Sequence, residues 1–209
     1  MNEYKIDNKK DFKGFMIGTI LGDSSLCGRK NKYLFTGHAE SQYNYMLWKL
    51  ETISEFIPVH YSITEKKQNS INKQRFFRAH TNTHHKITHY YNFIYKDNKK
   101  VISEYVLKNF NTVSLATLFM DDGSKEACFD KKYQVKKLKS YKISLGNFTY
   151  EDVILLSEHL KKNFGLHNSV YLEKRKYPII RISRKADRER FKNIIEPYMH
   201  KDLMYKLSI

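Results

Sequence analysis

The chain contains two nine-residue stretches that decide its fold, MIGTILGDS at residues 16–24 and LATLFMDDG at residues 115–123. Each is an apolar run at helical spacing, which predicts a buried helix. Each also ends in an acidic residue, Asp23 in the first and Asp122 in the second. The same residue type therefore closes the same element in both halves of the chain.

Small residues lie within both runs. Gly18 and Gly22 are four residues apart, hence on one face of the first helix, and they leave its backbone bare for close approach by another helix. In the second run the small residue is Ala116. We expect these three residues to lie at a contact between the two helices, which would bring Asp23 and Asp122 together.

The position of the two acids predicts a cation site. A carboxylate at a helix C-terminus faces the negative end of the helix dipole and is unfavourable there without a compensating cation. Carboxylate oxygens, carbonyls and water are the ligands that Mg²⁺ takes in proteins. The alternative is that both acids are ordinary turn residues. Their repetition at equivalent positions favours a shared metal site over that alternative.

The order of elements is also duplicated. We expect each half to run αββαββα, with antiparallel sheets and helices, which makes the chain an α+β protein of two pseudo-symmetric halves. The predicted boundaries are an N-terminal extension at 1–11, a first half at 12–95, a linker at 96–112 and a second half at 113–209. Two such halves in one chain predict a monomer with internal pseudo-twofold symmetry. Segment by segment, we expect helices at 12–22, 42–56, 86–95, 113–121, 151–164 and 186–195, and strands at 33–39, 59–64, 75–81, 141–145, 169–173 and 178–184.

Charge points to the partner. The 209 residues carry 38 Lys and Arg against 22 Asp and Glu, a net charge of +16. Because such an excess repels itself, it is typical of a protein that meets a polyanion, and the spread of basic residues along the chain indicates a long nucleic-acid surface. A merely solvated basic face is the alternative. Duplex DNA, itself nearly twofold symmetric in its backbone, suits two related halves.

Other features narrow the protein class. The longest apolar runs fall far short of the ~20 residues that a membrane span needs, and the first twelve residues lack the apolar core of a signal peptide. The two cysteines, Cys27 and Cys128, lie in no metal-binding pattern and fit a reducing compartment. The bias toward Lys, Asn, Ile and Tyr is typical of an AT-rich genome. We expect a mitochondrial matrix or a bacterial or phage-infected cytoplasm, without secretion.

The two stretches resemble the LAGLIDADG homing endonuclease motif, and the chain is similar to the single-chain, two-motif form of that family. The first keeps Gly18, Gly22 and Asp23 at the motif positions, and the second opens with Leu115-Ala116 and closes with Asp122-Gly123, but has Thr117 and Asp121 where small residues are usual. The Met-Asp-Asp-Gly ending, Asn98-Lys99-Lys100 and the late Tyr205-Lys206-Leu207 look like the branch of the yeast mitochondrial omega-intron endonuclease.

The resemblance implies a fold and an activity. In that family the motif helices form the interface between the halves, their last acids hold Mg²⁺ at adjacent cleavage sites, and the sheets form a saddle over the DNA major groove. It implies a Mg²⁺-dependent double-strand break with 3′ overhangs at a long asymmetric target, which promotes intron mobility. By position, Asp23 and Asp122 would be the metal ligands, and Lys100 and Lys206 would be the basic residues near the scissile phosphates.

Strand alternation predicts the DNA-facing side chains. If the apolar residues of a strand face the helices, the intervening Arg, Lys, Ser and His residues face outward, where Arg and Lys pair with guanine O6 and N7. This selects Arg78, His80, Lys142, Ser144, Arg181 and Ser183. To these we add basic residues in or beside the predicted strands and two histidines at a helix start, namely Arg29, Lys32, Arg75, His84, His85, Lys174, Lys176 and Arg184.

Two other functions remain open at this point. The scaffold of this family can also assist splicing, so an intron maturase that binds RNA is one alternative. A DNA-binding regulator without catalysis is the other. Retention of both Asp23 and Asp122 favours cleavage, because binding alone does not require two juxtaposed acids.

Overall fold

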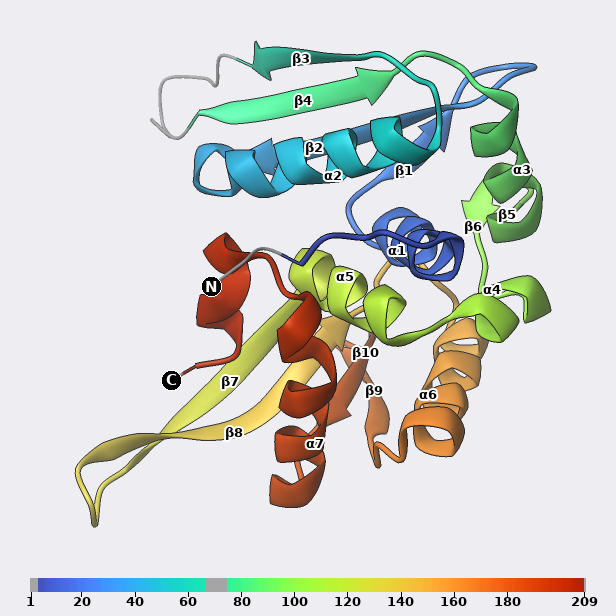
Figure 1. Ribbon diagram of the computed structural model, residues 1–209. Coiled ribbons are helices and arrows are strands. Elements are labelled where there is room, and N and C mark those ends of the chain that lie inside the picture. The colour runs from blue at the N-terminus through green and yellow to red at the C-terminus, as the bar shows by residue number, and fades with distance from the viewer. Residues whose placement is uncertain (1–3, 67–74, 209) are drawn as a thin grey trace.

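The computed structural model describes residues 4–66 and 75–208 of the chain. Two helices, α1 (Lys9–Leu21) and α5 (Thr112–Asp122), pack against each other at its centre. A four-stranded sheet lies on either side of this pair, so that the molecule has two halves joined at two helices (Figure 1). This arrangement confirms the duplicated α+β fold.

The first half follows the order αββαββα. After α1 come β1 (Ser25–Cys27), β2 (Tyr33–Ala39), the short 3₁₀ helix η1 (Glu40–Gln42), α2 (Tyr43–Phe56), β3 (Tyr61–Lys66), β4 (Phe76–Thr81) and α3 (His85–Ile94). The strands are all antiparallel in the order β1-β2-β4-β3.

The second half repeats this order. After α5 come β7 (Gly123–Asp130), β8 (Val135–Ser144), α6 (Tyr150–Phe164), β9 (Ser169–Glu173), β10 (Tyr177–Ile182) and α7 (Lys185–Ile195), and the 3₁₀ helices η2 (Glu196–Tyr198) and η3 (Lys201–Lys206) follow. The sheet order β7-β8-β10-β9 corresponds to that of the first sheet strand by strand. The two halves therefore share one topology.

Three boundaries differ from the sequence-based expectation. The first helix begins at Lys9, because the Asn8 side chain accepts from the Asp11 backbone N–H and caps it there, inside the segment expected to be an extension. The expected linker holds β6 (Lys99–Lys100), which pairs with β5 (Tyr95–Lys96), and α4 (Glu104–Asn109). Strands β1 and β7 lie where no individual strand was expected. Residues 1–3 and 209, at the ends of the predicted segments, lie outside the described residues.

The helix pair is in close contact because α1 has glycines on its inner face. A Cβ added at Gly18 would lie 2.5 Å from the Ser114 carbonyl oxygen, and one added at Gly22 would lie 2.5 Å from Asp121 Oδ2. Neither glycine can therefore become alanine without moving α5. Ala116 is fully buried in α5. None of the helices in the described ranges is long and apolar enough to cross a membrane.

Candidate active site

The two motif acids lie together where α1 and α5 end. Asp23 follows α1 by two residues and Asp122 is the last residue of α5. Burial is the main cause that raises both pKa values, and it raises the pKa of Asp122 to about 7. The next cause is repulsion from Asp121 for Asp23, and repulsion from Asp23 and Asp121 for Asp122. Two acids at neighbouring helix ends, partly shielded from water, form a site that attracts cations.

Each acid has a lysine beside it, placed in a related way. Lys100, in β6, donates from Nζ to the Gly22 carbonyl at 2.8 Å, and Lys206, in η3, donates to the Met120 carbonyl at 2.6 Å. Both lysines thus bind carbonyls at the C-terminal end of a motif helix, where a cation is favoured by the helix dipole. Burial lowers the pKa of both ammonium groups, while the neighbouring acids oppose that shift.

A third acid, Asp121, lies within the interface with its side chain fully buried. It forms an ion pair with Lys49 of α2 at 3.0 Å, and the Tyr45 hydroxyl donates to it at 2.8 Å. Its other oxygen accepts from the backbone N–H of Asp23 at 3.1 Å. Asp121 therefore links α5 of the second half to α2 and to the active-site backbone of the first half.

His38 closes the site on the side of β2. Its Nδ1 lies 2.9 Å from Gln42 Oε1 and 3.8 Å from Asp23 Oδ2. Because an amide oxygen only accepts, Nδ1 carries the hydrogen. Burial, with the nearby Lys49 charge, lowers the pKa of His38 to about 4, so the ring is neutral at pH 7.

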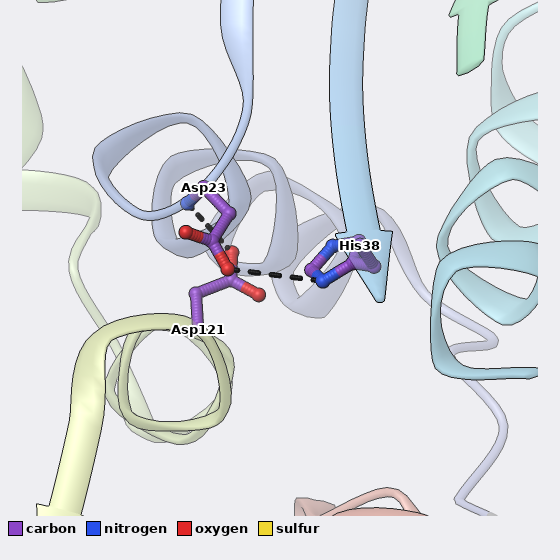
Figure 2. A group of neighbouring side chains, drawn as sticks. All are labelled: Asp23, His38 and Asp121. Carbon is purple, nitrogen blue, oxygen red and sulfur yellow. Dashed lines mark hydrogen bonds and ion pairs between the residues drawn. The ribbon is translucent and has the colours of Figure 1, made fainter. Parts of the chain in front are cut away.

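Potential metal-ligating atoms of Asp23, His38 and Asp121 lie within 4.8 Å of one another. Figure 2 shows these three side chains gathered where α1, α5 and β2 meet. Asp121 is not free to bind a cation, because both its oxygens already accept hydrogen bonds from Lys49, Tyr45 and the Asp23 backbone. The carboxylates of Asp23 and Asp122 are the oxygen donors that remain. This donor set suits a hard divalent cation such as Mg²⁺.

The second sheet places several predicted DNA-facing residues on its open face. In β8, Tyr141 and Ile143 are buried, while Lys142 between them is partly exposed and Ser144 is exposed. Lys142 and Arg181 of β10 are directly opposite each other in the strand register. Ser183 and Arg184 follow β10 and are exposed, and Lys174 and Lys176 lie in the exposed turn between β9 and β10.

The first sheet is arranged in the same way. In β4, Ala79 is buried between the exposed Arg78 and His80. Arg29 and Lys32 lie in the turn between β1 and β2, where Lys32 donates to the Gly28 carbonyl at 2.6 Å. Both sheets, with their turns, therefore expose basic side chains.

Two of the predicted DNA-binding residues are placed differently from the others. Arg75 forms ion pairs with Glu65 at 2.8 Å and Glu40 at 3.0 Å, so its charge is already neutralised. His85 lines a pocket between α1, α2 and α3, together with Phe12 and Phe56. His84 precedes α3 and caps it by accepting from the Lys86 backbone N–H. For Arg75 and His85 a DNA-facing role stays a prediction, although each side chain has protein neighbours of its own.

Sequence reasoning missed His38, Tyr45, Lys49 and the role of Asp121. A signal existed for Lys49: it lies four residues after Tyr45 and four before Ile53, on the apolar face of the predicted helix. Because a lysine on such a face needs an anionic partner, it indicated a buried acid elsewhere. His38 likewise continues the buried face of its strand, after Leu34 and Thr36. Neither pattern shows which residue would be the partner of Lys49 or of His38.

Comparison with known proteins identifies the family. Residues 13–189 match the model of the LAGLIDADG DNA endonuclease family. The chain belongs to the LAGLIDADG DNA endonuclease family. It is 31% identical over 194 residues to the "Probable intron-encoded endonuclease 1" of Wickerhamomyces canadensis, a match that covers 92% of this chain and 81% of that protein.

Solved LAGLIDADG structures share the fold. The structure of the homing endonuclease I-WcaI bound to its DNA recognition sequence matches 97% of this chain and 88% of its own with a TM-score of 0.79 and 28% identity. A variant of I-DmoI with its nicked target DNA in the presence of manganese covers 93% of this chain and 100% of its own, with a TM-score of 0.61 and 14% identity. The second likeness shows the fold alone.

Proposed function

We propose that this LAGLIDADG protein is a site-specific homing endonuclease that makes a Mg²⁺-dependent double-strand break with 3′ overhangs and so promotes intron mobility. The observation that carries the proposal is the paired arrangement at the ends of α1 and α5. Asp122 lies near enough to Asp23 for that charge to raise its pKa, and Lys100 and Lys206 bind the carbonyls of the same two helix ends.

The residues have distinct parts in this reaction. Asp23 and Asp122 would hold the divalent cation, which when bound would supply an activated water and neutralise charge on the scissile phosphate. Lys100 and Lys206 add positive charge beside that phosphate and stabilise the charge that develops in the transition state. Lys206 donates from its buried ammonium to Met120, and Lys100 donates to Gly22, so both are held in place before DNA binds.

The sheets supply the recognition surface. Most DNA affinity comes from the distributed Lys and Arg, and specificity comes from side chains that reach base edges in the major groove. A single chain contains both halves of the site, so we infer that it binds duplex DNA as a monomer. A sedimentation measurement on the DNA complex that gives two chains per duplex would contradict this.

The function is tested by cleavage mapping. Purified protein and Mg²⁺ should cut a library of candidate intron-insertion junctions at one site in both strands, and sequencing of the ends should show 3′ overhangs. Ca²⁺ in place of Mg²⁺ serves as the control, with binding expected and cleavage not. Recessed 3′ ends, or cuts at unrelated sequences, would contradict the proposal.

Cation binding should depend on pH in a defined direction. Without a cation, the folded protein keeps the Asp122 proton up to about pH 7, whereas the unfolded chain loses it near the ordinary Asp pKa of about 3.9. Between about pH 4 and pH 7 the folded state therefore binds more protons at Asp122 than the unfolded chain, and the free energy of unfolding falls as the pH rises. Because a cation binds the ionised form, the stabilisation by about 10 mM Mg²⁺ should be larger at about pH 8 than at about pH 6.

Thermal melts with and without Mg²⁺ measure this effect. We expect the Tm gain at the higher pH to exceed that at the lower pH by about 2–4 °C, which corresponds to about 1 kcal/mol for a chain of this size. The Asp122→Asn variant, whose side chain does not titrate, is the control and should show a smaller gain with less pH dependence. Equal gains at both pH values in the wild type would contradict the assignment of Asp122 to the cation.

A further inference from the structure

The open face of the second sheet carries an acid among its basic side chains, Glu126 of β7. In the strand register Glu126 lies opposite Ser140 of β8, and the pairing shifts between Glu126 and Ala127. A shift of this kind marks a bulge, which changes the direction of a side chain. The Glu126 carboxylate is 30% exposed and lies next to Arg181, which is 28% exposed. An acid on a surface that meets phosphates requires a reason, because it weakens general DNA binding.

Glu126 and Ser140 together hold one edge of the Arg181 guanidinium. Arg181 Nη2 donates to Glu126 Oε2 at 2.6 Å, and Arg181 Nε donates to Ser140 Oγ at 3.2 Å. The Ser140 hydroxyl in turn donates to the same carboxylate oxygen at 2.8 Å, which closes the set of three hydrogen bonds. Ser140 is fully buried and the Tyr171 ring lies 6.0 Å from the guanidinium carbon. The side chain of Arg181 is therefore fixed before DNA arrives.

This arrangement leaves a defined part of Arg181 available. A guanidinium has five N–H donors in one plane, and Nε with the adjacent Nη2 hydrogen forms its side edge. That edge is engaged by Ser140 and Glu126, and within the described ranges the Nη1 atom makes no hydrogen bond. The end edge, with one N–H each from Nη1 and Nη2, remains as a two-donor fork.

A two-donor fork matches one base in the major groove. Guanine presents two acceptors, O6 and N7, side by side, whereas adenine presents one acceptor and one donor. We propose that Glu126 is a positioning residue that fixes Arg181 so that its end edge reads a guanine of the target. This inference rests on the proposed function and specifies how one half of the protein selects its DNA. Glu126 thereby decreases general affinity and increases discrimination at one base pair.

Arg78 of the first sheet provides an internal comparison. It lies exposed on β4, and in the parts of the chain that the structure describes it has no carboxylate partner. Without such a partner its side chain is free to follow a phosphate. We therefore expect Arg78→Ala to weaken binding about equally for all sequences, and Arg181→Ala to relax the preference at a single position.

The experiment uses the full chain in Ca²⁺ and a pool of randomised DNA duplexes. The duplex that the wild type enriches is then synthesised with all four bases at each position. Glu126→Ala should reduce the preference for guanine at one position about tenfold, and it should leave the affinity for random duplex equal or higher. Glu126→Gln keeps an acceptor oxygen for Arg181 and should restore most of the preference, which a purely structural role of Glu126 would not predict.

Two further variants complete the design. Glu126 also pairs with Lys142 at 3.6 Å and with Lys139 at 3.7 Å, and effects through these two lysines should change the affinity for all sequences alike. At the guanine position, Glu126→Ala with Arg181→Ala should lose no more preference than Arg181→Ala alone, because the acid acts on that base pair through the arginine. Glu158→Ala removes an exposed acid of α6 that pairs with Lys161 and should leave the profile unchanged. A guanine preference that Glu126→Ala changes less than twofold, or an equal loss at every position, would overturn the inference while leaving the proposed function intact. Failure of the wild type to enrich any sequence would overturn both.

Discussion

The substitutions Asp23→Asn and Asp122→Asn are each expected to abolish double-strand cleavage while leaving DNA affinity within about threefold of wild type. Asparagine keeps the shape of the side chain but removes the charge that attracts the cation, and affinity depends mostly on the distributed Lys and Arg. Loss of a charged group that stabilises a transition state lowers the rate by about 10²–10³ or more. Cleavage in Mg²⁺ and gel shifts in Ca²⁺ measure the two effects separately.

The matched control is Asp7→Asn, which removes one acid from an exposed position before α1. It should cut at the wild-type rate. Burial and repulsion from Asp121 raise the pKa of both Asp23 and Asp122, and Asp23 also raises that of Asp122. Because either asparagine removes a partly buried charge and its repulsion from Asp121, the variants should be no less stable than wild type. A double variant that still cuts both strands at the wild-type rate would place the active site elsewhere.

The helices and strands that were predicted well are those in which apolar residues recur at regular spacing. The helices α2 and α6 begin within one residue of their expected positions, and β9 has the expected bounds, because each has a regular apolar face. Strands β1 and β7 have no such regular spacing of apolar residues. Ser25–Cys27 is three residues long, and β7 reads GSKEACFD without alternation. Their conformation is set by pairing with β2 and β8, which no local pattern shows.

Site residues could be proposed from the sequence where the same residue type occurs at the same position of both halves. Asp23 and Asp122 were named from the two motifs, and Lys100 and Lys206 from the family resemblance. The structure places all four at the ends of α1 and α5, and their roles stay predictions. Arg75 was not predictable in this way, because its partners Glu40 and Glu65 come from different elements. Side-chain partners that belong to separate elements are determined by packing, and the sequence gives only their charges.

The buried ion pair between Asp121 and Lys49 should have the largest effect on stability. Both side chains are fully buried, and the pair joins the two halves of the protein at 3.0 Å. Removing one partner leaves the other charge buried and uncompensated, which costs about 3–5 kcal/mol. Asp121→Ala and Lys49→Met should each lower the Tm by about 6–20 °C, since about 1 kcal/mol corresponds to about 2–4 °C for a chain of this length.

The double variant distinguishes a coupled pair from two independent residues. With both charges removed, no unpaired charge remains in the interface, so Lys49→Met with Asp121→Ala should be clearly more stable than the sum of the single effects predicts. The matched control pair is Lys161→Met with Glu158→Ala on the surface of α6, where an exposed ion pair contributes about 0–1 kcal/mol. Additive losses at Lys49 and Asp121 would show that the contact contributes no coupling. Non-additive losses would show that an acid at a motif position, where Gly22 stands in the first half, is tolerated because Lys49 neutralises it.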